Sequence, residues 1–238
     1  MGKADLHIHT RVSDGLATVS QVLEYVEHQT DLDVVAITDH EDAAGGLLAR
    51  ELAARRGYRF EVIAGAEITS LHGHVLGLFL ESTPRSFRTV ESTLEMIHDQ
   101  GGLAVAPHPL SWLTRSLSGR TMGRLAAGDG PRFDAVELAN ASPAGLRTSA
   151  AAARSNESAW RLPAVGGSDA HHLPHIASAW TEFPGLSADE LRQAILQGQT
   201  RAVLGPPRGS SRVGIRRLAF GLAWGYTATP RKLLRRRA

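Results

Sequence analysis

The sequence predicts an α/β fold in which one main domain contains about seven short strands, most of them separated by helices. The chain has 238 residues, 42% hydrophobic and 21% charged, which suits a single substantial core. Short apolar runs rich in β-branched residues alternate with segments of helical character. Polar residues follow several expected strands directly, at the edge where α/β barrels carry their chemistry.

The expected elements begin with a strand at residues 4–9, whose alternation places two histidines on one face. Thr18-Val19-Ser20-Gln21 has the pattern of a capping box and opens a helix that extends to about residue 27. Residues 33–38 form an apolar run typical of a buried parallel strand. Further strands are expected at residues 60–64, 74–80, 103–106, 135–138 and 164–166, and further helices at 43–56, 89–100, 144–161 and 188–197.

Charge divides the chain into an acidic body and a basic end. The last acidic residue is Glu190, and residues 191–238 carry eleven of the 26 Lys and Arg. Residues 1–190 therefore have a formal charge of −9, although the net charge of the whole chain is +2. The composition becomes that of a linker at Pro206. We expect a barrel domain at residues 1–205 and a basic, partly apolar extension at residues 206–238.

The absence of cysteine excludes disulfides and thiolate ligands, so any metal ion must bind to His, Asp or Glu. The first residues lack the apolar segment of a signal peptide. No stretch approaches the roughly 18 apolar residues that span a bilayer. These features are typical of a cytoplasmic protein.

Histidines and carboxylates gather at the expected strand ends. His7 and His9 are two residues apart, as are Asp169 and His171, and this spacing places both members of a pair on one side of a strand. Glu67 follows the third expected strand, where a carboxylate can bridge two ions. Each residue alone would be typical of an ordinary hydrogen-bonded position. Their joint occurrence at strand ends indicates a site for divalent metal ions.

Seven short motifs occur in a characteristic order. They are Asp5-Leu6-His7-Ile8-His9-Thr10, Ser13-Asp14-Gly15, Ile37-Thr38-Asp39-His40, Gly65-Ala66-Glu67-Ile68, His74-Val75-Leu76-Gly77, Ala106-Pro107-His108-Pro109 and Gly167-Ser168-Asp169-Ala170-His171. As an ordered set covering about residues 4–200, they resemble the PHP (polymerase and histidinol phosphatase) superfamily. The resemblance implies a distorted (β/α)7 barrel that hydrolyses phosphate esters and binds two or three divalent ions at the C-terminal strand ends. Histidine-rich ligation suits Zn²⁺, Mn²⁺ or Fe²⁺.

Residue by residue, the resemblance implies nine metal ligands in three sites. The first ion is expected between His7, His9, Glu67 and Asp169, the second between Glu67, His74 and His108, and the third between Asp14, His40 and His171. His74 is preferred to His72 because it directly precedes the Val75-Leu76-Gly77 part of its motif. A hydroxide that bridges two ions would then attack the phosphate, so no covalent intermediate is required.

Other polar residues are expected to support this site. Asp5 and Asp39 are candidates for orienting the ligand imidazoles, and an exposed Asp39 is also a candidate for proton transfer in catalysis. Arg115 and Arg147 are candidates for gripping a phosphate group, because both follow expected strand ends and a guanidinium offers paired donors to phosphate oxygens. Most arginines of this region are expected to be solvated surface charges.

The expected substrate is a phosphate monoester of a small metabolite or nucleotide, and no obligate protein partner is implied. Within phosphoester chemistry, 5′-3′ exonuclease and histidinol-phosphate phosphatase activity stay open. A C–N bond amidohydrolase is an alternative of a different class, which the third cation site disfavours because an extra cation suits an anionic substrate. A non-catalytic metal-binding module is disfavoured by the complete ligand set.

The basic extension has three open interpretations. Residues 218–226 are apolar with aromatic side chains, and residues 231–237 are mostly basic. This composition suits contact with an anionic membrane, which would place the protein peripherally at the inner membrane surface. It also suits contact with the phosphates of a nucleic acid. In the third interpretation, the apolar part packs on the acidic barrel.

Overall fold

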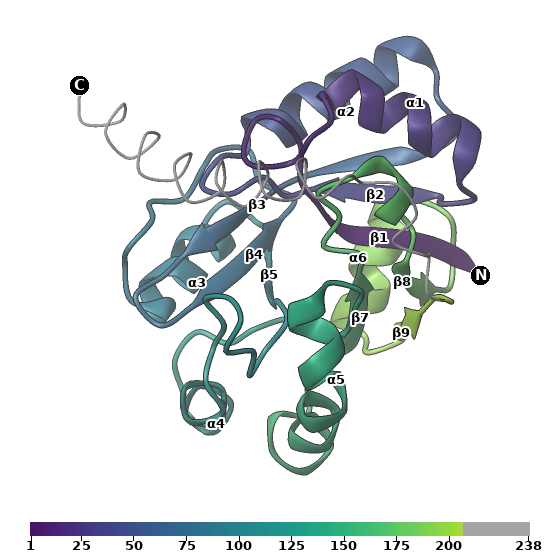
Figure 1. Ribbon diagram of the computed structural model, residues 1–238. Helices are drawn as coiled ribbons and strands as arrows, with labels where there is room; N and C mark the ends of the chain where they lie inside the picture. Colours follow the sequence, from purple (N-terminus) through teal and green to yellow (C-terminus); the bar gives the residue numbers. More distant parts are fainter. Residues whose placement is uncertain (207–238) are drawn as a thin grey trace.

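The computed structural model describes residues 1–206 (Figure 1). In this part of the chain, one mixed sheet has the strand order β7-β6-β5-β4-β3-β2-β1-β8-β9. The strands are β1 (Gly2–Ile8), β2 (Val34–Ile37), β3 (Glu61–Thr69), β4 (His74–Leu78), β5 (Leu103–Ala106), β6 (Ala135–Asn140), β7 (Ala164–Gly167), β8 (Ala179–Phe183) and β9 (Arg201–Leu204). The α-helices are α1 (Val19–Gln29), α2 (Ala44–Arg56), α3 (Val90–His98), α4 (Gly119–Ala127), α5 (Pro143–Ser155) and α6 (Ala188–Leu196).

The sheet contains two parallel blocks. Strands β1, β2 and β3 are parallel, as are β5, β6 and β7. Strand β4 is antiparallel to both β3 and β5, and β8 is antiparallel to both β1 and β9. The strand expected at residues 74–80 is thus present as β4, and it runs antiparallel to its two neighbours. Residues 70–73, which join β3 to β4, form a connection too short for the crossover that a parallel pair needs.

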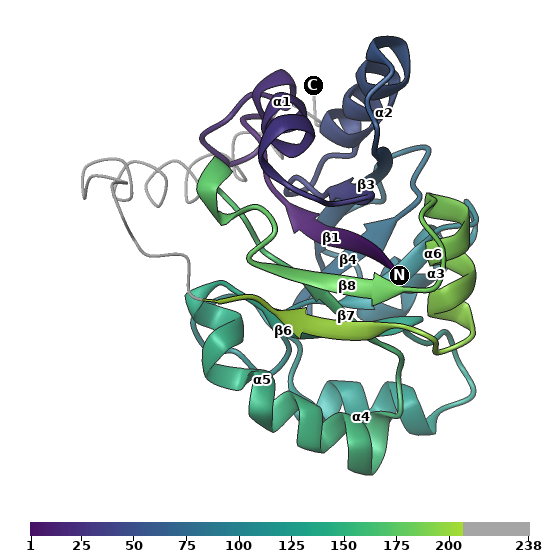
Figure 2. The ribbon, with the colours of Figure 1, turned by 90° about the vertical axis from the view of Figure 1, so that its right-hand side faces the viewer.

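The two ends of the sheet approach each other, so the barrel is nearly closed. Ile8 at the end of β1 forms a parallel bridge with Ala170, just after β7. The backbone N–H of His9 donates to the carbonyl of Ala170 at 3.0 Å, and the Thr181 hydroxyl of β8 donates to the carbonyl of Gly166 at 2.9 Å. Helices lie on the outside (Figures 1 and 2). This architecture confirms the predicted fold class, a distorted α/β barrel.

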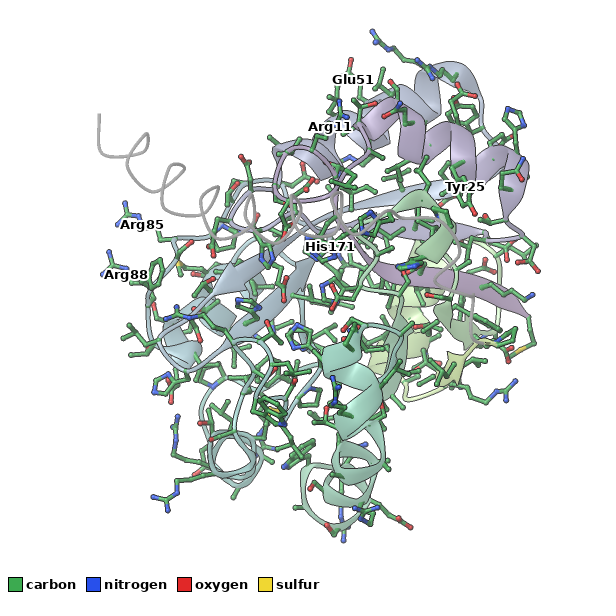
Figure 3. All side chains as sticks on the ribbon, in the orientation of Figure 1. Arg11, Tyr25, Glu51, Arg85, Arg88 and His171 are labelled. Carbon is green, nitrogen blue, oxygen red and sulfur yellow. The ribbon has the colours of Figure 1, made fainter. Side chains whose placement is uncertain are left out.

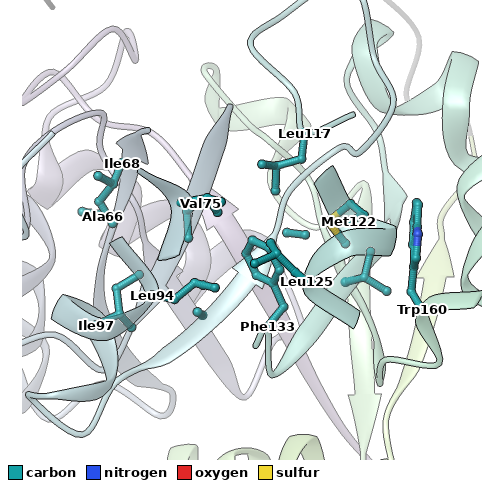
Figure 4. Packing of buried hydrophobic residues seen from close by; sticks show 14 of the residues in the cluster. Ala66, Ile68, Val75, Leu94, Ile97, Leu117, Met122, Leu125, Phe133 and Trp160 are labelled. Carbon is teal, nitrogen blue, oxygen red and sulfur yellow. The ribbon is translucent and has the colours of Figure 1, made fainter. Parts of the chain in front are cut away.

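The hydrophobic core has an interior part and two outer parts. The barrel interior is filled by side chains such as Leu6, Leu76 and Phe183, together with Leu191 of α6. A second cluster lies between the sheet and helices α1 and α2. A third joins buried residues of strands β3 to β6 with residues of α3 and α4, and includes the large ring of Trp160 (Figure 4). These layers anchor the strands, so their C-terminal ends are held in fixed positions.

Two strands, one α-helix and a short 3-10 helix at Leu173–His175 were not predicted, and one predicted helix was divided. Strands β8 and β9 and helix α4 fall in segments for which we expected no element. The helix predicted at residues 144–161 ends at Ser155 and continues as a π-helical segment, Asn156–Trp160. The Asn156 side chain bonds both the N–H and the carbonyl of Leu162 at 2.9 Å, which fixes the chain at this change. The capping box at Thr18 and Gln21 is confirmed.

The described residues contain no helix long and apolar enough to cross a membrane. The membrane and nucleic-acid contacts predicted for the basic extension fall on residues 207–238, which lie outside the described residues.

Candidate metal centre

The nine residues expected as metal ligands lie together at the C-terminal end of the parallel strands. They form four overlapping groups, in each of which the potential ligand atoms lie within 4.8 Å of one another. The groups are His7, His9 and Asp169; His7, Glu67 and His108; His40, Glu67 and His74; and His9, Asp14, His40 and His171. We call these nine residues the cluster. Figure 3 shows one member, His171, near the middle of the molecule.

Glu67 occupies the centre of the cluster and contacts five histidines. Its Oε1 atom lies 2.8 Å from His74 Nδ1 and 3.0 Å from His108 Nε2. Its Oε2 atom lies 3.1 Å from His40 Nδ1. The same oxygen lies 3.6 Å and 3.5 Å from the Nε2 atoms of His7 and His9. Glu67 was expected just after its strand, but β3 continues to Thr69 and includes it, so the backbone ladder itself fixes this carboxylate.

Two inner histidines lie at the spacing of neighbouring metal ligands from two carboxylates. The Nε2 atoms of His7 and His9 each lie 3.4–3.6 Å from Glu67 Oε2 and from Asp169 Oδ1. A tetrahedral ion about 2.1 Å from each ligand separates its ligands by about 3.4 Å. These four distances suit neighbouring ligands of one divalent ion, and His7, His9 and Asp169 also form one of the four groups named above.

Several buried polar atoms of the cluster lack a hydrogen bond within the described part of the chain. They are His7 Nε2, both ring nitrogens of His9, Asp14 Oδ1 and His74 Nδ1. An unsatisfied buried polar group costs about 1–3 kcal/mol, and buried polar groups are normally paired. Because these atoms all belong to the cluster, a bound cation accounts for all of them together. The residues present fit a multinuclear divalent metal centre.

Without cations, the opposite charges of the cluster shift the pKa values of several of its members. Burial opposes charge on His7, but the carboxylates of Asp169, Glu137 and Glu67 outweigh it and raise the pKa of His7 well above its usual value. Burial also opposes charge on Glu67, yet the surrounding histidines hold the pKa of this carboxyl well below its usual range. A divalent ion would compete with protons for the same lone pairs.

The remaining group lies nearer to solvent and contains Asp14, His40 and His171. Asp14 Oδ2 lies 3.1 Å from His171 Nε2 and 3.6 Å from His40 Nε2. Despite burial, the Asp14 carboxylate raises the pKa of His171 to about 10. Burial lowers the pKa of His40 to about 4. The side chains of Asp14, His40 and His171 are 12%, 18% and 33% exposed. This group therefore forms the accessible face of the cluster.

Asp39 does not have the position expected for a proton-transfer residue. It is fully buried, and both carboxylate oxygens accept hydrogen bonds from the backbone and side-chain groups of Thr10 and Ser13, at 2.5–3.1 Å. It thus anchors the loop that carries Asp14. Asp5 likewise accepts from backbone N–H groups, those of Ser168 and Ala177 among them, and burial raises its pKa to about 6. Both aspartates hold backbone near the cluster, which corrects the expectation that they orient imidazoles.

The two arginines proposed for phosphate binding are exposed, and none of their described contacts is with a side chain of the cluster. Arg147 donates to the carbonyl of Pro143 in its own helix at 3.3 Å. Arg115 lies over the ring of Phe87, although its carbonyl accepts from the N–H of His74 at 2.8 Å. Their role in phosphate binding stays a prediction. His72 contacts the N–H of Val90, in agreement with the choice of His74 for the cluster.

Sequence reasoning missed the polar residues that hold the ligands in place. Glu137 Oε1 lies 3.1 Å from His7 Nδ1, and the Ser116 hydroxyl lies 2.8 Å from His108 Nδ1. Asn140 donates to Glu137 at 2.7 Å. Glu137 follows the apolar pair Ala135-Val136 in an expected strand, and an acidic residue there was the one signal available. Two cluster residues also have strained backbone, with φ 30° at His108 and 55° at Asp169.

Comparison with known proteins gives three curated relatives of informative similarity. An uncharacterized protein of Methanocaldococcus jannaschii is 39% identical over 130 residues, which cover 50% of this chain and 74% of that protein. A phosphoribosyl 1,2-cyclic phosphate 1,2-diphosphodiesterase of Eggerthella lenta is 38% identical over 101 residues, 40% of this chain and 37% of the relative. A 3′,5′-nucleoside bisphosphate phosphatase of Chromobacterium violaceum is 37% identical over 86 residues, 34% of this chain and 29% of the relative. The matches to the two enzymes thus span about a third of their lengths.

A family model and a solved structure agree with these matches. Residues 149–200 match a family model described as PHP-associated. The crystal structure of a two-domain protein from Bacteroides vulgatus, containing a predicted PHP-like metal-dependent phosphoesterase, has a TM-score of 0.66. It is 20% identical, and the alignment covers 85% of this chain and 64% of that one. At this identity the likeness concerns the fold.

Proposed function

Because this chain belongs to the PHP-domain family of metal-dependent phosphoesterases, we propose that it hydrolyses a phosphate monoester of a small metabolite or nucleotide. The observation that carries the proposal is the central position of Glu67 among five histidines. A carboxylate with both oxygens so placed can hold two ions at the short separation that phosphoryl transfer uses.

We propose that all nine cluster residues serve as ligands for two or three divalent ions. His7, His9, Glu67 and Asp169 would hold one ion, Glu67 with His74 and His108 a second, and Asp14 with His40 and His171 a third. The geometry adds that His7, His9 and His40 each belong to two groups, as Glu67 does, so neighbouring sites share ligands. Bound ions would supply an acidified water and neutralise the phosphate oxygens.

The chain's own residues would divide the remaining tasks between binding and exclusion of water. The buried histidines around Glu67 keep water away from the inner carboxylates, which strengthens every charge interaction there. Asp14, His40 and His171 face solvent, so a phosphate group would arrive on their side. Ser116 fixes the ring of His108 by a hydrogen bond at 2.8 Å.

An exposed tryptophan favours a nucleotide among the small phosphate esters. Trp112 is 78% exposed and lies on the segment between His108 and Ser116, two residues joined by a hydrogen bond. The carbonyl of Arg115, on the same segment, accepts from the N–H of His74 at 2.8 Å, so the segment is tied to the cluster at two points. An indole ring can stack on a nucleobase. Histidinol-phosphate phosphatase, 5′-3′ exonuclease and amidohydrolase activity remain the alternatives.

The experiment that tests the proposal compares metal content with phosphatase turnover. Protein depleted of metal and reloaded with Mn²⁺, Zn²⁺ or Fe²⁺ should hydrolyse p-nitrophenyl phosphate, and His9→Ala or Asp169→Ala should abolish both bound metal and turnover. Asp134→Asn is the matched control for Asp169, because Asp134 bonds His98 and the backbone of Ala104 outside the cluster. Full activity in either metal-depleted variant would overturn the proposal.

A second arm of the experiment addresses the substrate. Trp112→Ala should raise KM for nucleoside monophosphates about tenfold or more, because stacking on an aromatic side chain contributes about 1–3 kcal/mol per base. It should leave turnover of a phosphate ester without an aromatic ring, such as glycerol phosphate, unchanged. Leu196→Ala, which removes an exposed side chain from α6, is the control. An unchanged KM for all nucleotides tested would leave a non-nucleotide phosphate as the substrate.

A further inference from the structure

We infer that Glu137 is a positioning residue of the metal centre. It orients the ring of His7 and keeps a proton on His7 Nδ1, and it also holds the backbone of His108. Asn140 assists by a hydrogen bond to Glu137. Neither residue is among the nine cluster residues. The inference rests on the proposed metal centre and adds to it a device that controls how tightly the ions bind.

A local irregularity of β6 places the two side chains on the same side. Residues three apart on a regular strand point to opposite faces. Glu137 pairs with Val165 of β7, but Ala139 pairs with the next residue, Gly166, so β6 contains one extra residue between them. Such a bulge shifts the alternation by one position. Asn140 can therefore donate to Glu137 Oε2 at 2.7 Å.

Glu137 uses both of its oxygens on the cluster or its support. The Oε1 atom lies 3.1 Å from Nδ1 of His7. The Oε2 atom accepts from the backbone N–H of His108 at 2.8 Å as well as from Asn140. Its side chain is 1% exposed, so water does not compete for these bonds. His108 has a strained backbone, with φ at 30°. Because strained backbone persists only where the surroundings restrain it, the hydrogen bond to Glu137 supplies such a restraint.

Two glycines leave the space that this arrangement needs. A Cβ atom at Gly167 would lie 2.7 Å from Glu137 Oε1 and 2.6 Å from His7 Cβ. A Cβ atom at Gly145, in α5, would collide with the side chain of Asn140. The pair is thus packed closely against the backbone of β7 and α5.

The carboxylate determines which nitrogen of His7 faces the cluster with a lone pair. The hydrogen bond to Glu137 keeps a proton on His7 Nδ1, so a divalent ion that displaces the other ring proton would bind at Nε2. This Nε2 lies 3.6 Å from Glu67 Oε2 and 3.5 Å from Asp169 Oδ1 and lacks a hydrogen-bond partner in the described residues. It is therefore ready to bind an ion.

Glutamine of the same shape cannot reproduce these bonds. Glu137→Gln has one acceptor oxygen, but three donors meet it, from His7, His108 and Asn140. If the amide oxygen faces His7, the amide NH₂ group points at the N–H of His108 and at the side-chain amide of Asn140, which are donors too, so no hydrogen bond forms there. If the amide turns, it donates to His7 Nδ1, and the proton moves to the nitrogen that should bind the ion.

The test measures metal affinity by chelator competition, using Zn²⁺ and Mn²⁺ as probes, in the full-length protein. Glu137→Gln should weaken binding about 10–100-fold, the usual effect of removing a residue that orients a metal ligand. Asn140→Ala should weaken metal binding less than Glu137→Gln does. Asn140 has only one hydrogen bond to a cluster side chain, and that bond, to Asp169, is long at 3.5 Å. Asp134→Asn is the control for a purely structural loss: it should lower thermal stability without changing affinity.

A spectroscopic readout keeps the inference testable if the variant fails to fold. In ¹⁵N NMR spectra of the Zn²⁺-loaded wild-type protein, the ring of His7 should carry a proton on Nδ1. The His7 signals are assigned as those missing from the spectrum of a His7→Asn variant. Wild-type affinity in folded Glu137→Gln, or a His7 without a proton on Nδ1, would overturn the inference alone. Failure of the wild-type protein to bind any divalent ion would instead overturn the proposed metal centre.

Discussion

The cluster has an inner and an outer half that differ in their access to solvent. The inner half consists of His7, His9, Glu67, His74, His108 and Asp169, whose side chains are between 0% and 10% exposed. The outer half, Asp14, His40 and His171, is 12–33% exposed. The inner half is built mainly on strands and on segments directly after them, whereas Asp14 comes from a loop. The outer half is therefore the part of the cluster that solvent reaches.

The largest effect is expected from Glu67→Gln, which removes the charge at the centre of the inner half. Turnover should fall at least about a thousandfold, because metal-ion stabilisation of a phosphoryl transition state contributes several kcal/mol. Metal content measured by elemental analysis should fall by more than one ion per chain. Glu61→Gln, at the opposite end of the same strand, is the control and should keep its ions. If Glu67→Gln retained all ions, Glu67 would not bridge two ions.

A smaller effect is expected from His171→Ala in the outer half. This variant should lose one ion and about a hundredfold in turnover, comparable to the loss of one charge-stabilising group, while the inner ions stay bound. His172→Ala changes the next residue, which contacts the ring of His175, and should retain both properties. If His171→Ala lost every ion, the two halves would form one cooperative site, and the comparison drawn above would be wrong.

The pair of Asp14 and His171 also makes the stability of the metal-free protein depend on pH. The raised pKa of His171 contributes stability that is present below pH 6.5 and lost as pH rises through about 10. The lowered pKa of Asp14 contributes stability that is present above pH 3.8 and lost on further acidification. In urea unfolding, Asp14→Asn should therefore destabilise the metal-free protein most between pH 4 and 6.5 and little at pH 11. A pH-independent difference would contradict this assignment.

The smallest effect is expected at a position that supports the scaffold alone. The Thr18 hydroxyl caps α1, and its loss in Thr18→Ala should lower the free energy of unfolding by about 1 kcal/mol. Metal affinity and turnover should not change, because α1 packs on the outside of the sheet. Urea unfolding of the metal-free protein measures the first quantity. A loss of metal here would mean that the outer half depends on the packing of α1.

Much of the fold was predictable because its signals are local. The run at residues 103–106 is a strand with those bounds, and the capping box at Thr18 opens a helix. The direction of β4 was not predictable from its own apolar residues, since parallel and antiparallel strands bury similar side chains. Strand β8 has only five residues, and its alternation of buried and half-buried positions depends on its place between β1 and β9. Helix α4 buries only Met122 and Leu125, too few for a clear helical period.

The chemistry of the cluster was determined by the sequence itself. Nine residues able to bind a metal ion are identifiable from short motifs, because the ligand chemistry resides in the side chains and the motifs keep local order. Which groups those residues form, and which of them face solvent, was decided by the tertiary structure. The position of Asp39, which binds a loop and not an imidazole, was decided in the same way.

The support of the ligands belongs wholly to the tertiary structure. Glu137 is 130 residues from His7 in the chain and reaches it only because the barrel nearly closes and β6 contains a bulge. A bulge and a hydrogen bond between distant strands leave no local pattern, since each depends on the packing of the neighbouring strand. The sequence alone thus determined what can bind a metal ion, and the fold decided how each ligand is held.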